Sequence, residues 1–358
     1  RDRSVMRMTT ANIDRIEIKS NEAGGSRTLE LRRVNNLWRL TKPINSGADQ
    51  TAVENLLYEM SSLQATDFVS EGAAELKTFG LAEPTLEIMV GFKTAGSLPR
   101  TLLIGDPVKN QPKMRYAKVQ DRTTIVTIPG ETITTFNLKV DQVRNSHLVS
   151  TSLTDVGKIT LAAGGQNLEL VLRDGQWTIS GPESLKADQP AIEDLLAKTQ
   201  EQKIAKFVSD APSDLKPYGL DTPSAVLSFF ADTAAEKPAV RLLFGKHKGQ
   251  DCYAKNETEP FVYLVNPTLP ALVNPTPWAW IDREITRINP DEVRELKIEQ
   301  NQGARSFTAV CDETGKNWTP AGGSAATAAI KMPCLNRILT ALQNLRASSV
   351  AGSADQKA

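Results

Sequence analysis

Apolar residues recur at two periods along this chain, and each period predicts a different element. From Ile13 to Trp38 they alternate with polar residues, which is typical of three short antiparallel strands joined by turns. From Val53 to Leu63 they follow helical spacing and predict an amphipathic helix. Alternation then returns, and the predicted strands cover residues 86–92, 101–104, 116–119 and 125–128. The unit is therefore three strands and a helix, followed by four strands and a short helix.

The same pattern returns 139 residues later, with Trp38 matched by Trp177. A third, incomplete copy begins near Val293 and places Trp318 at the same strand position. An internal repeat of this kind predicts stacked supersecondary units. The expected domains are repeat 1 over residues 11–150, repeat 2 over 151–288, a partial repeat 3 over 289–350 and a frayed tail over 351–358. Cutting the chain after each first half is equally consistent, so the phase of the repeats stays open.

These elements predict an α+β fold, because strands that follow one another through short turns form mainly antiparallel sheets. The connections between copies are short and not rich in glycine, which favours an elongated array over beads on a flexible string. The third copy stops after its first half, so the array is expected to end in three strands and one helix.

Composition supports packed cores and argues against several classes of partner. In 358 residues, 40% are hydrophobic, and 42 Lys and Arg balance 42 Asp and Glu. A neutral chain without a basic block has no general attraction for nucleic acid or anionic membrane. No apolar run approaches the ~18 residues of a membrane span. Because the chain opens at Arg1 rather than at Met, a signal peptide or membrane anchor could precede it.

Few residues point to reactive chemistry, and no cofactor is expected. Neither a phosphate-cradling loop nor a dinucleotide fingerprint is present, and His147 and His247 stand in non-equivalent places. The three cysteines are too few and too widely spaced for a zinc site. Cys311 and Cys334 could pair within the third copy, although buried free thiols are the favoured interpretation.

The motifs that recur in order resemble the bacterial family known as domain of unknown function 4340. In the first copy they are Trp38, Ala48-Asp49-Gln50, Phe68-Val69, Phe79-Gly80-Leu81, Pro84, Gly105 and Tyr116-Ala117-Lys118. In the second they are Trp177, Ala187-Asp188-Gln189, Phe207-Val208, Tyr218-Gly219-Leu220, Pro223, Gly245 and Tyr253-Ala254-Lys255. The third copy departs from this pattern, because Lys331 replaces the aspartate and the glycine turn is missing.

The resemblance implies a location and a class of partner but no catalytic residues. Such proteins typically carry one N-terminal membrane anchor with an extracytoplasmic, periplasmic remainder. They are often encoded beside ABC-type transporter components of the kind linked to gliding motility. The resemblance therefore implies protein partners in a membrane transporter complex, with the membrane contacted only through an anchor that this chain lacks.

Several repeated residues have both a functional and a structural interpretation. Asp49 and Asp188 could form an acid–base pair, but each precedes a helix, where capping is favoured. The strand tryptophans at 38, 177 and 318 favour a core role over a ligand platform. Gly80 and Gly219 suit a positive φ at the end of a short helical turn. All of these residues are therefore expected to be structural.

Specificity is expected where the copies differ. Trp278 and Trp280 have no aromatic counterparts in copy one, and on an extended segment they would share one side, either packed between modules or exposed as a binding patch. Two hairpin loops of different length could carry recognition or be solvated tips. Their candidate residues are Asp106, Lys109, Lys113, Lys246, His247 and Lys248.

The expected function is a non-catalytic extracytoplasmic scaffold or interaction module, an accessory subunit of an ABC-type transport or gliding-type membrane complex. One alternative is a periplasmic binding module for a polysaccharide or peptide in a cleft between repeats. A second alternative is a hydrolase that uses carboxylates brought together between copies. This alternative requires a pair of Asp or Glu residues with perturbed pKa values.

Overall fold

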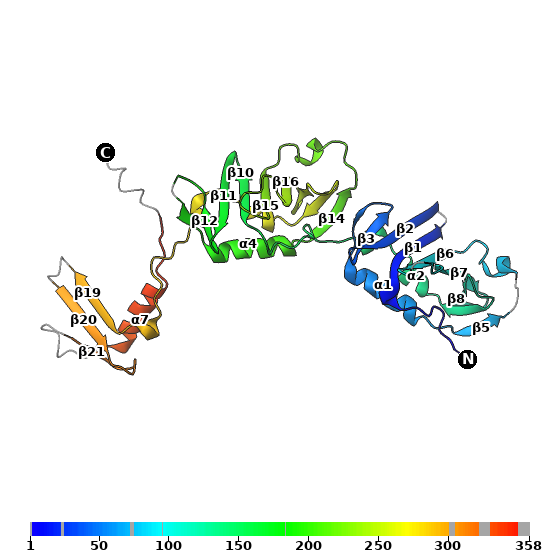
Figure 1. Ribbon diagram of the computed structural model, residues 1–358, viewed down its shortest axis with the longest axis horizontal. Coiled ribbons are helices and arrows are strands. Elements are labelled where there is room, and N and C mark those ends of the chain that lie inside the picture. The colour runs from blue at the N-terminus through cyan, green and yellow to red at the C-terminus, as the bar shows by residue number, and fades with distance from the viewer. Residues whose placement is uncertain are drawn as a thin grey trace. The chain divides into compact units, whose positions relative to one another are not determined.

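A computed structural model describes residues 2–22, 25–71, 75–94, 96–182, 184–300, 305–321 and 330–349. The chain divides into two compact units, Arg1–Gly165 with Leu195–Val273, and Gln166–Asp194 with Asn274–Ala358. The tail predicted to fray, residues 351–358, lies outside the described residues. Figure 1 shows the order of the elements along the chain.

The first copy forms one antiparallel sheet of nine strands, in the order β4-β3-β2-β1-β6-β7-β8-β9-β5. Its strands are β1 Ile13–Glu22, β2 Gly25–Val34, β3 Leu37–Lys42, β4 Ser46–Gly47, β5 Asp67–Ser70, β6 Leu86–Phe92, β7 Arg100–Val108, β8 Gln111–Val119 and β9 Ile125–Pro129. Its helices are η1 Thr10–Asn12, α1 Gln50–Ser62, η2 Leu76–Phe79, α2 Thr132–Phe136 and α3 Val140–Val143.

The second copy repeats this sheet in the order β13-β12-β11-β10-β15-β16-β17-β18-β14. Its strands are β10 Lys158–Ala163, β11 Gln166–Arg173, β12 Gln176–Ile179, β13 Leu185–Lys186, β14 Ile204–Ser209, β15 Ala225–Phe230, β16 Val240–Lys248, β17 Asp251–Asn256 and β18 Val262–Val265. Its helices are α4 Gln189–Glu201, η3 Lys216–Tyr218, α5 Thr268–Ala271 and α6 Pro277–Trp280.

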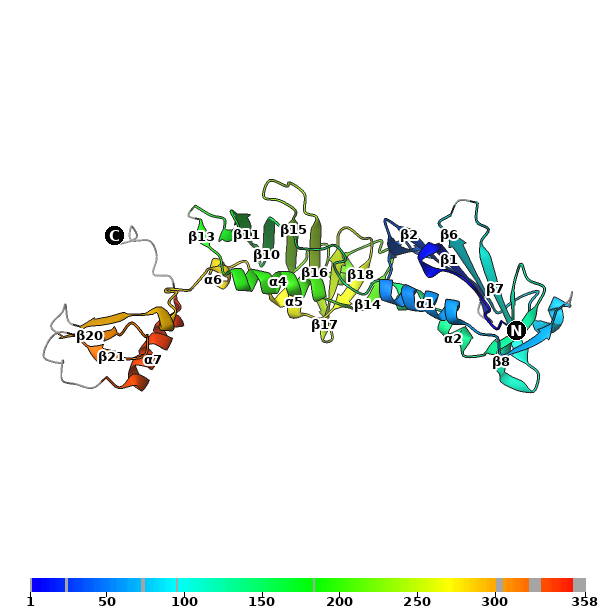
Figure 2. The same ribbon diagram turned by 60° about the horizontal axis from the view of Figure 1, so that its bottom comes forward.

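The described part of the third copy contains the first half of the unit, as predicted. Its sheet has three strands in the order β19-β20-β21, and α7 lies against it (Figures 1 and 2). The elements are η4 Pro290–Glu292, β19 Glu295–Gln300, β20 Arg305–Cys311, β21 Trp318–Pro320 and α7 Met332–Gln343. We call this third copy, together with the connection that leads into it from residue 281, the half-module. The α+β class, the antiparallel sheets and the tandem repeat are confirmed.

The two halves of a full copy share one sheet, which the periodicity of the sequence did not indicate. Ile16 of β1 lies opposite Leu31 of β2 on one side and opposite Val90 of β6 on the other. The first strand therefore lies inside the sheet, with the second half of the unit built onto its far edge. The short strands β4 and β5 were also not predicted.

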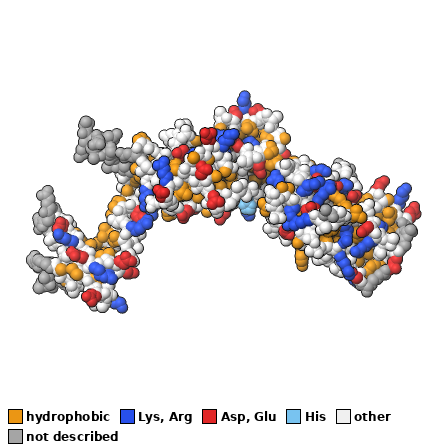
Figure 3. Space-filling model, viewed as in Figure 1, with side chains coloured by type: hydrophobic (Ala, Val, Ile, Leu, Met, Phe, Trp, Pro, Cys, Tyr) orange, Lys and Arg blue, Asp and Glu red, His pale blue; other side chains and the backbone are white. Residues whose placement is uncertain are grey.

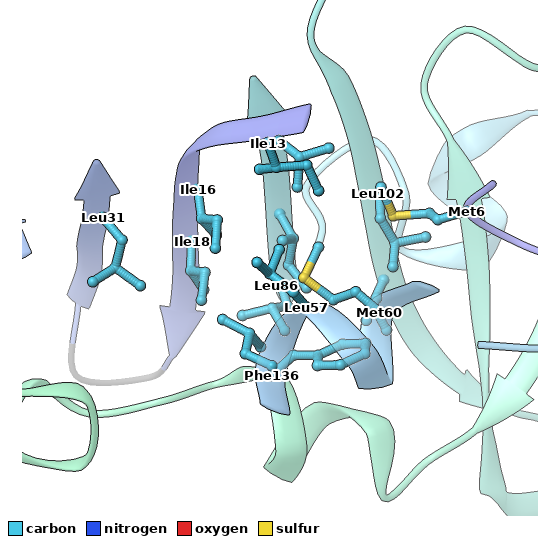
Figure 4. Close-up of a cluster of buried hydrophobic side chains, with 14 of the residues drawn as sticks. Met6, Ile13, Ile16, Ile18, Leu31, Leu57, Met60, Leu86, Leu102 and Phe136 are labelled. Carbon is cyan, nitrogen blue, oxygen red and sulfur yellow. The ribbon is translucent and has the colours of Figure 1, made fainter. Parts of the chain in front are cut away.

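Alternation along the strands places one row of apolar side chains against α1. In β1, Ile16 and Ile18 are buried, while Arg15 points to the other face of the sheet. Figure 4 shows these isoleucines beside Leu57 and Met60 of the helix and Phe136 of α2. Four residues of the helical stripe are at most 3% exposed, as its spacing predicts; they are Val53, Leu56, Leu57 and Met60. The fifth, Leu63, follows the end of α1 and is half-buried against the same core. Helix and sheet therefore close one hydrophobic core.

The connection after the first copy, residues 144–148, is held by backbone hydrogen bonds at both of its ends. The amide of Asn145 donates to the carbonyl of Gly47 at 3.0 Å. The amide of Leu148 donates to the carbonyl of Gln202, which follows α4, at 2.9 Å. This short linker is therefore an ordered strand-like segment within its compact unit.

The next connection, residues 281–285, makes the matching bonds. The amide of Asp282 donates to the carbonyl of Lys186 at 2.9 Å, and the amide of Ile285 donates to that of Leu345 at 3.0 Å. The same contacts thus recur at the start of the half-module. Each linker belongs to the architecture of the repeat.

Candidate functional site

The recurring tryptophans lie in the cores of their copies. Trp38 is 1% exposed and Trp177 is 4% exposed, while Trp318 is half-buried beside the half-module core. The indole N–H of Trp38 donates to Glu54 of α1 at 3.2 Å. Gln50 accepts from the backbone amide of Trp38 and donates to its carbonyl, at 2.8 and 3.0 Å. This part of the motif therefore joins a strand to a helix.

Asp49 and Asp188 lie at the starts of two different helices. The amide of Ala52 donates to Asp49 Oδ1 at 3.0 Å, and the amide of Ala191 donates to Asp188 Oδ1 at 3.2 Å. Each carboxylate thus satisfies an amide that the helix leaves unpaired, and it sits at the positive end of the helix dipole. The structure shows each in a capping position on its own helix.

We expect Asp49→Ala to lower the free energy of unfolding by about 1 kcal/mol, because the helix loses its cap. Asp49→Asn should recover most of this loss, since an amide oxygen also accepts the bond from Ala52. Urea unfolding followed by circular dichroism measures both variants. Equal destabilisation by alanine and asparagine would contradict the capping role.

The aromatic–glycine–leucine turn packs on the outer face of each sheet. Gly80 and Gly219 have φ of 67° and 68°, the left-handed region that favours glycine. The ring of Tyr218, just before the second glycine, lies 5.1 Å from the ring of Tyr253 in edge contact. A Cβ on Gly245 would lie 2.2 Å from the carbonyl oxygen of Tyr218. In the second copy, Gly219 therefore allows the turn to form and Gly245 allows β16 to contact it.

A charged cluster covers the outer face of the first sheet. Glu30, whose side chain is 3% exposed, lies 2.7 Å from Arg15 Nε, 2.8 Å from Arg32 Nη2 and 3.4 Å from Lys42 Nζ. Burial by itself would raise the pKa of Glu30, but the hydrogen bond from Arg32 and the charge of Arg15 lower it below the ordinary value. The carboxylate therefore stays ionised and links three strands.

Acidic and basic side chains are interspersed over the rest of the surface as well. On the face shown in Figure 3, blue and red side chains occur together in every part of the described chain. This agrees with the equal numbers of acidic and basic residues. No strongly single-signed surface is visible in this view that would steer a polyanion.

Arg144 is a structural residue that the sequence did not single out. Its side chain is 2% exposed, and its guanidinium lies 3.8 Å from the ring centre of Phe207 and 4.1 Å from that of Phe261. Nη1 donates to Asp210 at 2.7 Å. Arg144 therefore anchors the first linker onto β14 and the start of β18. The Phe-Val motif marked one partner, but nothing local in the sequence pointed to the arginine.

The structure corrects the interpretation of Trp278 and Trp280. They lie on α6, a single helical turn, so they do not share one side as they would on an extended segment. Trp280 is 5% exposed and its indole N–H donates to the carbonyl of Asn274 at 2.6 Å. Trp278 is half-buried, with the guanidinium of Arg283 5.4 Å from its ring. Of this pair, Trp278 alone is left partly accessible for a binding patch.

The six candidate loop residues lie on two equivalent hairpins. Asp106, Lys109 and Lys113 are exposed on the β7–β8 hairpin, and Lys246, His247 and Lys248 are exposed on the β16–β17 hairpin. Lys246 Nζ donates to the carbonyl of Lys216 at 3.1 Å. Each set lies together on its own hairpin.

The described residues contain no group of three or more His, Cys, Asp or Glu arranged to hold a metal ion. His147 is exposed in the first linker, as is His247 on its hairpin. The three cysteines are free, so Cys311 and Cys334 do not pair, and Cys334 is exposed rather than buried. Burial, and then the charge of Asp251, raise the pKa of Cys252 to about 11, which keeps it a thiol.

The half-module exposes a position that the full copies bury. In each copy one apolar residue donates a backbone bond to a residue just after the main helix; the pairs are Val5 with Leu63, Leu148 with Gln202 and Ile285 with Leu345. Val5 is 4% exposed and Leu148 is 1% exposed, but Ile285 is 57% exposed. The half-module therefore leaves apolar surface at an equivalent place in its fold.

In a full copy, the second half covers this position. In the first two copies the second half reaches this position, where Arg122 after β8 donates to the carbonyl of Val5 and Asn256 at the end of β17 donates to that of Leu148. The half-module has no described counterpart of these strands. Ile285 and the neighbouring Leu345, which is 40% exposed, are thus uncovered.

No helix among the described residues combines the length and the apolar character needed to cross a bilayer. No curated protein and no solved structure matches the chain. One family model does, a domain of unknown function (DUF4340), which matches residues 38–183 and again residues 177–358. These two matches include both sets of recurring motifs and the half-module. The chain therefore belongs to the DUF4340 family, as its motifs indicated.

Proposed function

We propose that this chain is a non-catalytic interaction module that binds protein partners. The exposure of Ile285 carries the proposal, because the same position is buried by the chain itself in both full copies. An apolar position that a fold normally covers is typical of a surface completed by another molecule. The half-module thus offers apolar surface that a partner can cover.

The roles of the recurring residues support a non-catalytic function. The buried Trp38 and Trp177, the helix caps Asp49 and Asp188 and the close-packed Gly245 each serve the fold of their own copy. Residues that act on a substrate would instead converge on a common site. The surface of the half-module is therefore the candidate site of function.

The identity of the partner rests on the family resemblance. The resemblance supports the role of an accessory subunit in an ABC-type transport or gliding-type membrane complex. Such a subunit lies on the extracytoplasmic side of the membrane and is held by an N-terminal anchor. This part of the proposal is an analogy at the level of the family.

Purification from native membranes tests the proposal. The tagged chain should recover ABC-type transporter subunits, and the pair Ile285→Lys and Leu345→Lys should reduce this recovery at least about tenfold, because lysines replace apolar contacts. The matched control is the pair Leu37→Lys and Tyr58→Lys, which changes apolar side chains of copy one that are 60% and 66% exposed. Unchanged recovery by the half-module variant, or no transporter subunit in any purification, would refute the proposal.

A further inference from the structure

The half-module has an open sheet edge at the strand that lies inside the sheet in the full copies. β1 pairs with β2 and β6, and β10 pairs with β11 and β15. The equivalent strand, β19, pairs with β20, and no described strand pairs with its other edge. An unpaired edge of this kind is a template for strand addition.

The full copies show what kind of strand this edge accepts. In the second copy, Ile159 and Leu161 of β10 lie opposite Phe229 and Leu227 of β15 in antiparallel register. The corresponding apolar residues of β19 are Leu296 and Ile298, both packed on the half-module core. The added strand should therefore be antiparallel and should place an apolar residue beside Ile298.

The backbone groups at the open edge belong to three charged residues. The amide of Cys311 donates to the carbonyl of Arg294 at 2.8 Å, which fixes Arg294 as a residue bonded to β20. Since bonding alternates along an antiparallel strand, the backbone groups of Glu295, Lys297 and Glu299 point toward the open edge. Their side chains are exposed, and Lys297 Nζ lies 2.6 Å from Glu299 Oε1.

This order of charges makes β19 complementary to itself. In an antiparallel pair of two β19 strands with Ile298 on the twofold axis, Lys297 of each strand lies opposite Glu299 of the other. With Leu296 on the axis, Lys297 lies opposite Glu295 instead. Both registers place opposite charges across the seam and bring the outward backbone groups face to face. The register centred on Ile298 also places Ile298 beside its own counterpart, with Leu296 opposite Gln300, whereas the register centred on Leu296 places Ile298 opposite Arg294. A register centred on Lys297 would instead oppose like charges.

We propose that β19 strands from two copies of this chain pair antiparallel and join two half-modules into one continuous sheet. A twofold axis perpendicular to the sheet keeps both α7 helices on the same face, where the full copies carry α1 and α2. The pairing satisfies the open backbone groups in a closed, isologous interface. It goes beyond the proposed function, because it assigns a second partner, another copy of this chain, to the sheet edge of the half-module.

Charge reversal on the full chain tests the pairing. Lys297→Glu makes all three outward positions acidic, and the pair Glu295→Lys with Glu299→Lys makes them all basic. The wild type should dimerise in sedimentation velocity, and each variant alone should dissociate with a Kd raised about tenfold or more, because like charges then face each other on both sides of the twofold axis. A 1:1 mixture of the two variants should recover the dimer.

The controls separate pairing from folding and from general charge. All three side chains are exposed, so the far-ultraviolet circular dichroism spectrum of each variant at about 25 °C should match that of the wild type. Lys93→Glu makes the same charge change at an exposed residue after β6 of the first copy and should leave the dimer intact. A monomeric wild type, a dimer unaffected by Lys297→Glu, or a mixture that stays monomeric would each overturn the pairing.

The result separates this inference from the proposed function. Transporter subunits recovered by a chain that is monomeric would overturn the pairing alone. A charge-sensitive dimer that recovers no transporter subunit would uphold the pairing and overturn the accessory-subunit role.

Discussion

Replacing Trp38 by alanine should lower the free energy of unfolding of the first copy by about 3–5 kcal/mol, the range for large-to-small substitution of a buried aromatic residue. Trp38 is 1% exposed between its strand and α1, so its removal leaves a cavity that the sheet and helix cannot fill. The variant also removes the indole donor to Glu54. Hydrogen exchange resolved along the chain and urea unfolding would measure the loss.

The control for Trp38 is Tyr58→Ala on the helix that Trp38 contacts. Tyr58 is 66% exposed, and its truncation should change the free energy of unfolding by no more than about 0.5 kcal/mol. Trp177→Ala should act like Trp38→Ala in the second copy, where the ring is 4% exposed. Folded, stable protein after Trp38→Ala would show that the recurring tryptophan is not a core residue and would reopen a role in ligand binding.

Gly245→Ala should destabilise the second copy by about 2–3 kcal/mol, because a methyl group enters a backbone contact with no free space. The added Cβ would lie 2.2 Å from the carbonyl oxygen of Tyr218 and 3.1 Å from the backbone of Gly219. Neither is the tip of a flexible side chain, so the turn must move away from β16. Near-ultraviolet circular dichroism should then report the separation of the Tyr218 and Tyr253 rings, now 5.1 Å apart.

Gly47→Ala is the matched control for this substitution. A Cβ at Gly47 would meet its nearest neighbour, Asn145 Cβ, at 3.5 Å, which is an ordinary contact. Its effect on the free energy of unfolding should stay within about 0.5 kcal/mol. If Gly245→Ala proved as neutral as Gly47→Ala, the close approach of turn and strand would not explain the second glycine of the motif.

Local periodicity of apolar residues was sufficient to predict most of the helices and strands. The stripe from Val53 to Met60 is buried against the sheet, and the alternation in β1 separates Ile16 from Arg15 as expected. These predictions succeed because the spacing of side chains on a helix or strand follows from backbone geometry alone. The same reasoning placed Asp49 and Asp188 before their helices.

Where prediction failed, the deciding contact was distant or the segment was short. β1 pairs with β6, so Ile16 lies opposite Val90 although a whole helix separates the two residues in sequence. No local pattern of residues predicts this pairing. Trp278 and Trp280 are too few residues apart to separate an extended segment from one turn of helix. The structural role of Arg144 depends on its contacts with the rings of Phe207 and Phe261, which lie far from it in the sequence.

Spacing along the chain is enough to establish the repeat and its strand and helix content, because the same spacing recurs from copy to copy. The folded arrangement was needed to show that the halves of a copy complete one sheet, that Ile285 is exposed, and that no described strand pairs with the outer edge of β19. Burial and edge pairing are properties of residues brought together from distant positions, so neither can be read from a single segment.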